Sequence, residues 1–112
     1  MNETLKEIHD LLVDRVDSLS DAVGKTNDVA TAKQLLVEMQ EVLHRVNVTQ
    51  NLLFTQASQE LKDMLPAIKQ ADSELKQSLQ SVQNAVKVIA QTSQLLEYVD
   101  KALDLAKTLA LI

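Results

Sequence analysis

Aliphatic residues recur at intervals of three or four along almost the whole chain, from Leu5 to Ala110. This spacing keeps apolar side chains on one stripe of an α-helix, because successive residues are about 100° apart around the helix axis. The sequence contains only one glycine and one proline, so few residues interrupt a helix. It contains no cysteine, so no disulfide can cross-link the fold. We therefore predict an all-α fold in which helices pack on helices within a single domain, residues 1–112.

Two helices are predicted in the first half of the chain. The first has Asn2 as its N-cap, ends near Gly24 in a left-handed C-cap, and carries an apolar stripe of Leu5, Ile8, Leu12, Val16, Leu19 and Val23. The second begins in the polar turn 25–28, and its stripe alternates strictly by three and four through Val29, Ala32, Leu36, Met39, Leu43 and Val46. We expect it to continue through the polar residues 47–60 to a junction near Pro66, because that segment lacks glycine and proline.

A third helix is expected from Ile68 to Ala110, since nothing in that range obviously breaks a helix. About forty helical residues would span ~60 Å. The predicted architecture is an antiparallel bundle of three long helices, with a shorter first helix covering a hairpin of the second and third. A four-helix bundle is the alternative, with a further turn at 72–73 or 92–93.

The first helix carries acids at the same 3-4 spacing, on a stripe roughly opposite its apolar one. Carboxylates four residues apart repel each other by a few tenths of a kcal/mol, so this array opposes helix stability. It is either a docking face for a basic partner or a solvated face that keeps the chain soluble. The candidate residues are Glu3, Glu7, Asp10, Asp14, Asp17 and Asp21.

The C-terminal segment 102–112 has apolar residues around more than half of its circumference. One stripe facing a neighbouring helix cannot bury all of them. Leu105, Leu109 and Ile112 form an additional ridge, and an exposed apolar ridge usually marks an interface with another chain. The alternatives are that the first helix covers this ridge or that the end frays.

The net charge of −5 and the absence of a Lys/Arg cluster argue against nucleic acid as a partner. No stretch approaches the ~18 uncharged apolar residues of a membrane span, which disfavours a membrane. The N-terminal residues lack the pattern of a signal peptide, and we expect a cytoplasmic protein.

Catalytic chemistry is not predicted. A single glycine cannot build a glycine-rich phosphate loop. Glu41 and His44 have the i, i+3 spacing of ligands in di-iron helical bundles, but a second Glu-x-x-His motif is missing. We expect no catalytic residue, no metal and no cofactor.

The sequence therefore favours a non-enzymatic helical-bundle or coiled-coil module for protein–protein interaction or assembly. It would bind a protein partner, or itself as a homo-oligomer, through the C-terminal ridge and the acidic face of the first helix. The alternative is a membrane-active or pore-forming helical protein, suggested by the low charge of residues 77–96 and the apolar tail.

Overall fold

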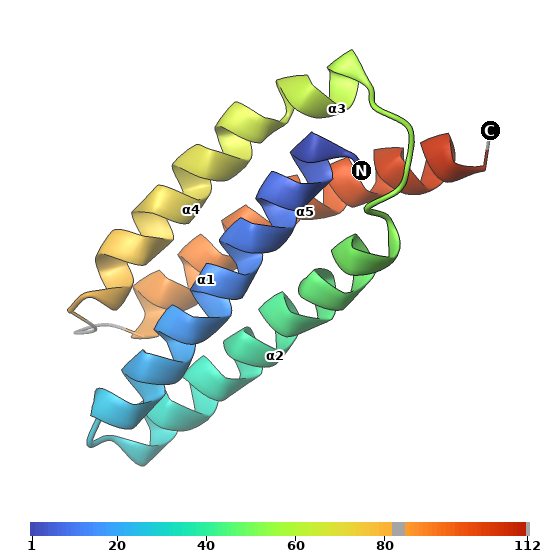
Figure 1. Cartoon of the computed structure of the whole chain (residues 1–112). Coiled ribbons are helices and arrows are strands. Elements are labelled where there is room, and N and C mark those ends of the chain that lie inside the picture. Colours follow the sequence, from blue (N-terminus) through green and yellow to red (C-terminus); the bar gives the residue numbers. More distant parts are fainter. Residues whose placement is uncertain (82–84, 112) are drawn as a thin grey trace.

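The computed structural model describes residues 1–81 and 85–111, and every regular element within them is a helix (Figure 1). Four of the helices are long and one is short: α1 (Glu3–Lys25), α2 (Val29–Asn51), α3 (Gln59–Asp63), α4 (Leu65–Leu79) and α5 (Ala85–Ala110). The predicted all-α bundle is confirmed, and the described helices correspond to its four-helix alternative.

The long helices pack as two antiparallel pairs, α1 with α2 and α4 with α5 (Figure 1). The pairs are joined because α1 also contacts α4, and α2 also contacts α5; in both of these contacts the helices run in the same direction (Figure 1). The segment between α2 and α4 therefore crosses one end of the bundle. The resulting molecule measures 48 × 21 × 17 Å.

One continuous apolar core runs between the four long helices. Aliphatic side chains at helical spacing are fully buried in it, which is the main favourable contribution to folding for a chain without disulfides. The largest of them are Leu5, Ile8, Leu12, Leu19, Leu35, Val42, Leu61, Ile68, Leu75, Val88, Leu95 and Val99.

The predicted helix starts are confirmed by their caps. The Asn2 side-chain oxygen accepts a hydrogen bond from the Leu5 amide at 3.0 Å, and Asp28 accepts one from the Thr31 amide at 3.2 Å. The predicted left-handed cap at Gly24 is wrong, because α1 continues through Lys25 and its glycine has no positive φ. The extended residue Thr26 ends the helix instead, with its amide bonded to the Ala22 carbonyl.

The second helix is shorter than predicted. It ends at Asn51, and residues 52–58 form an irregular connection before α3. The prediction failed because a residue distant in sequence binds this connection: Asn2 donates hydrogen bonds to the carbonyls of Leu53, Thr55 and Gln56. Pro66 then lies in the first turn of α4, where its missing amide hydrogen costs nothing.

The chain from Ile68 to Ala110 is divided between α4 and α5 rather than forming one helix. The turn begins at Gln80, not at the proposed positions 72–73 or 92–93. A continuous helix would extend about 65 Å, well beyond the 48 Å length of the molecule. Folding back lets the apolar faces of α4 and α5 bury each other.

The apolar stripe predicted for α2 is rotated relative to the one that faces the core. Leu35, Val42 and Val46 are buried, whereas Val29, Leu36 and Leu43 are exposed. On α1 the error is smaller: Arg15 and Ala22 occupy core positions, and the neighbouring Val16 and Val23 are half-buried.

Candidate interaction surfaces

The predicted C-terminal ridge is partly covered by the bundle. Leu105 is half-buried against the core and Leu109 is also half-buried, whereas Ile112 lies outside the described residues. Leu111, which was not singled out from the sequence, is 89% exposed. The end of α5 extends past the other long helices (Figure 1).

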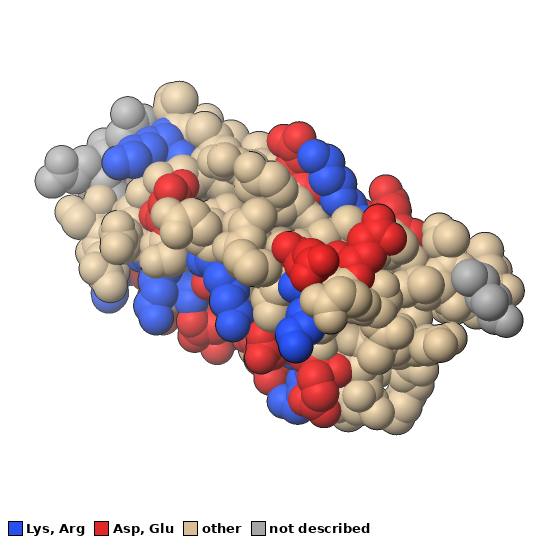
Figure 2. Space-filling model, turned by 90° about the horizontal axis from the view of Figure 1, so that it is seen from above, with Lys and Arg blue, Asp and Glu red and all other residues tan. Residues whose placement is uncertain are grey.

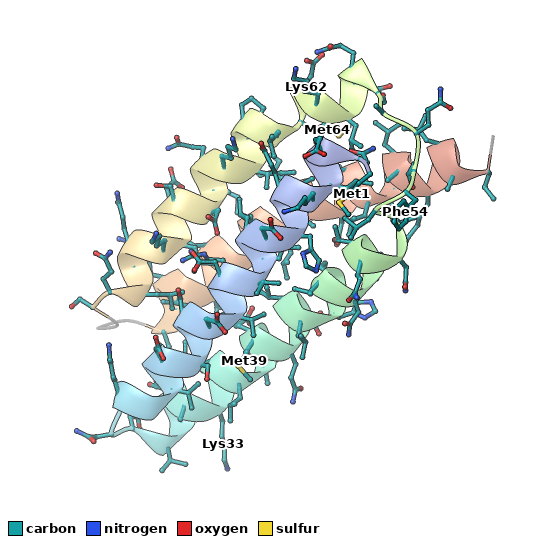
Figure 3. The ribbon with its side chains drawn as sticks, viewed as in Figure 1. Met1, Lys33, Met39, Phe54, Lys62 and Met64 are labelled. Atoms are coloured by element: carbon teal, nitrogen blue, oxygen red, sulfur yellow. The ribbon has the colours of Figure 1, made fainter. Side chains whose placement is uncertain are left out.

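A second exposed apolar side chain, this one aromatic, lies at the same end. Phe54, in the connection after α2, is 85% exposed. Helices α2 and α5 run parallel with Arg45 beside Asp100, a separation of 55 residues, so Asn51 at the end of α2 lies near the level of Ala106 in the last turns of α5. Phe54 follows Asn51 in the irregular connection at that end (Figure 3). Figure 3 shows Met1, also exposed, near Phe54. We call Met1, Phe54, Leu109 and Leu111 the end surface.

The position of Phe54 is fixed by Asn2, which is only 4% exposed. The Asn2 backbone amide donates to the Leu53 carbonyl at 2.7 Å, and its side-chain amide donates to the carbonyls of Thr55 and Gln56, each at 3.2 Å. The connection that carries Phe54 is therefore bound to the start of α1. The run Leu52-Leu53-Phe54 within a polar segment is the sequence signal that could have indicated this surface.

Charged side chains are unevenly distributed over one face of the molecule (Figure 2). Figure 2 shows acidic and basic residues gathered along the middle of one face, while uncharged residues form the right-hand end of that face. An exposed apolar area bordered by polar groups is typical of a binding surface.

All six predicted acidic residues of α1 are exposed. Three of them bind cations of this chain. Asp10 pairs with Lys6 at 2.7 Å, Glu7 pairs with Lys69 of α4 at 3.3 Å, and Asp14 contacts Arg15. The hydrogen bond from Lys6, with a smaller contribution from His9, lowers the pKa of Asp10. In residues 1–81 and 85–111, Glu3, Asp17 and Asp21 form no ion pair and face solvent.

Arg15 is buried in the bundle, although it lies outside the apolar stripe predicted for the first helix. Its side chain is 1% exposed and extends from α1 to α4, where Nε lies 2.7 Å from Oδ1 of Asp72. The guanidinium also donates to Asp14 and, at 3.2 Å, to the Ser18 hydroxyl. Burial raises the pKa of Asp72 to about 6, against the opposing attraction of Arg15.

A second arginine–aspartate pair joins α2 to α5. Arg45 forms two hydrogen bonds with Asp100, from Nε at 3.0 Å and from the terminal nitrogen at 3.1 Å. It also binds Glu41 on its own helix. These contacts raise the pKa of Arg45, with the Asp100 hydrogen bond contributing most. Each contact between parallel helices thus contains one arginine–aspartate pair.

Helix α2 has a row of exposed aliphatic side chains at seven-residue spacing. Val29 is 68%, Leu36 38% and Leu43 43% exposed. Leu43 and Arg45 point in nearly opposite directions, since two residues correspond to 200° around a helix. Arg45 contacts α5, so the row faces away from α5. We call these three residues the α2 row.

Other kinds of site find little support in the described residues. Among them, no three or more His, Asp or Glu side chains are arranged to hold a metal ion. Glu41 instead pairs with Arg45. A solvent-open hollow of about 530 Å³ lies between the start of α1 and α3. The serine that lines it, Ser58, uses its hydroxyl to cap α3 by accepting a hydrogen bond from the Leu61 amide. None of the described helices has the length and apolarity needed to cross a bilayer.

Comparison with protein-family models, with curated proteins and with solved structures found no match to this chain.

Proposed function

We propose that this protein is a non-enzymatic helical-bundle module that binds another protein through the end surface. One observation carries the proposal: Phe54 and Leu111 are the two most exposed large apolar side chains among the described residues, and the connection after α2 and the end of α5, which carry them, lie at the same end of the bundle (Figure 1).

The cost of leaving these side chains in water supports this role. Covering a phenylalanine or leucine side chain stabilises a complex by about 1.5–3 kcal/mol. The connection carrying Phe54 is already ordered by three hydrogen bonds from Asn2, so binding loses little further backbone entropy. A preorganised aromatic anchor is the usual centre of a protein interface.

The acidic face of α1 supplies the second part of the proposal. Glu3, Asp17 and Asp21 are free to attract a basic partner. Exposed charges at the rim of an interface mainly accelerate association and improve partner choice, and they contribute less to affinity. A partner with an apolar pocket and a basic border fits both features.

The experiment compares proteins captured from the source cell by two immobilised baits, the wild-type chain and a Phe54→Ser, Leu111→Ser double variant. We expect at least one protein to bind the first bait and not the second. Both side chains are exposed, so the substitutions should leave the thermal unfolding temperature unchanged. Removal of residues 102–112 is a poorer test, because Ala102, Leu103 and Ala106 are buried.

Two controls make the result specific. Val37→Ser removes an exposed aliphatic side chain from α2, away from the end surface, and should retain the partner. Vesicles of neutral and of anionic lipid test the membrane-active alternative with the same baits. Equal capture by wild type and double variant would contradict the proposal, as would binding to vesicles that the double substitution abolishes.

A further inference from the structure

We propose that the outer face of the α1–α2 pair is an interface between two copies of this chain, with the two α2 helices packed antiparallel about Leu36. This inference is independent of the proposed role of the end surface. It depends on the α2 row, on Val13 of α1 and on the distribution of charge around them.

The apolar stripe of α2 is wider than the bundle can cover. Leu35, Val42 and Val46 face the core, and Val29, Leu36 and Leu43 lie beside them on the exposed side. The exposed residues belong to a strict 3-4 alternation spanning three heptads, the pattern of a helix that packs lengthwise on another helix. Among residues 1–81 and 85–111, no helix covers this side of α2.

Helix α1 extends the same face. Val13 is exposed and, two residues from Arg15, points in nearly the opposite direction from that side chain. Arg15 reaches α4, so Val13 faces away from α4. It also lies near the level of Leu43, because α1 and α2 are antiparallel with Asn2 beside Leu53.

The charge distribution favours a second copy as the occupant. The chain carries a net charge of −5, and two such molecules repel when their acidic faces approach. Of the four charged residues of α2, Glu41 and Arg45 belong to the ion pairs beside α5, and Glu38 is half-buried. Lys33 is the one remaining formal charge of α2, so two α2 helices can approach along this row with less repulsion than two acidic faces of α1.

Lys33 also selects the direction of packing. In a parallel pair, Lys33 would face Lys33 of the second copy. In an antiparallel pair centred on Leu36, Lys33 faces Met39 and Gln40 of the second copy, and Val29 faces Leu43. The antiparallel arrangement thus matches every aliphatic residue of the row with another and separates the two lysines.

The available area is sufficient for a specific dimer. Helix α2 has 23 residues and is about 34 Å long, and the molecule is 21 Å across. A two-helix face of this size covers roughly 700 Å² per copy, close to the ~800 Å² per partner of a standard interface.

Sedimentation equilibrium of four proteins tests the proposal: wild type, Val29→Glu, Leu43→Lys and the double variant. We expect reversible wild-type dimers and a dimer dissociation constant roughly tenfold higher in each single variant. In the double variant, the acid introduced at position 29 of each copy meets the base introduced at position 43 of the other, and the constant should return to within about threefold of wild type. Val29 is the first residue of α2, where an acid is favourable to the helix, so this variant should fold normally.

Leu111→Glu is the matched control, because it adds a charge at an exposed apolar position far along α5 from this face. It should not change the dissociation constant. A wild-type monomer at all concentrations would overturn the proposal. So would a double variant as weak as the single ones, which would exclude antiparallel pairing, or a loss of dimer in Leu111→Glu, which would assign self-association to the end surface.

Discussion

Helices α1 and α2 have 23 residues each and pack antiparallel against one another, yet their outer faces differ in kind. The outer face of α1 carries six exposed carboxylates, whereas that of α2 carries the aliphatic α2 row and a single lysine. The neighbouring helices cover nearly all of the apolar stripe of α1. On α2 they cover Leu35, Val42 and Val46 but leave the α2 row exposed. The difference leaves α1 with a charged outer face and α2 with apolar surface in excess of what the described residues of its own chain bury.

The first prediction contrasts one leucine from each helix. Leu12→Ala on α1 should reduce the free energy of unfolding by about 2–5 kcal/mol, because it opens a cavity at a fully buried position. Leu36→Ala on α2 should cost well under about 1 kcal/mol in dilute protein, because this side chain is already partly in water. Urea denaturation at low protein concentration measures both. Similar losses would mean that the α2 row is buried within the monomer.

The second prediction contrasts the two arginines. Arg15→Ala leaves Asp72 inside the bundle without its main cation, and we expect a loss of about 3 kcal/mol at pH 7. Arg45→Ala, on the more exposed pair, should cost about 1 kcal/mol or less. The same denaturation experiment compares them, and a larger loss for Arg45→Ala would contradict the assigned burial.

The third prediction concerns the pH dependence of Asp72. Its pKa is about 6 in the folded protein, above the ordinary value near 3.9, so the folded state binds the proton more tightly. The resulting stabilisation is fully present below about pH 4 and is lost as pH rises through 6, with a magnitude on the order of 2 kcal/mol. Asp72→Asn removes this dependence.

The measurement is the difference in unfolding free energy between wild type and Asp72→Asn at pH 4.5 and at pH 7. The lowered pKa values of Asp10 and Asp28 act in the opposite direction, but they are common to both proteins and cancel in the difference. Parallel pH profiles for the two proteins would show that Asp72 is not held in a desolvated site.

The smallest expected effect lies on the acidic face. Asp17→Asn relieves the repulsion between Asp17 and Asp21, four residues apart on α1, and should stabilise the protein by a few tenths of a kcal/mol at low salt. The gain should disappear in about 1 M salt, where the charges are screened. A thermal melt at both salt concentrations measures it, and a salt-independent change would point to a contact other than charge repulsion.

The sequence predicted the helical class, both capped helix starts and four of the core positions of α1, because local spacing and capping decide these features. It did not predict which stripe of α2 faces inward. Leu35 and Leu36 are adjacent, and so are Val42 and Leu43; the choice between them depends on where α1 and α5 lie. Arg15 was missed for a similar reason, since its burial depends on Asp72, 57 residues away.

The candidate surfaces were predictable to different degrees. The acidic residues of α1 follow a local 3-4 spacing that places them opposite its apolar stripe. All six are exposed, as this position on the helix predicts. The end surface depends on long-range contacts: Asn2 binds the connection that carries Phe54, and the parallel packing of α2 and α5 brings that connection to the level of the last turns of α5. The spacing of apolar residues within either segment does not predict these contacts.

We infer that α2 turns Leu35 and Val42 inward and leaves Leu36 and Leu43 exposed, available to a second copy of the chain. Methyl NMR with a soluble paramagnetic probe tests it most directly, in the Val29→Glu variant at low concentration so that self-association does not hide the face. We expect strong broadening of the Leu36 and Leu43 methyl signals and little broadening of those of Leu35 and Val42. The reverse pattern, or equal protection of all four residues, would contradict the account.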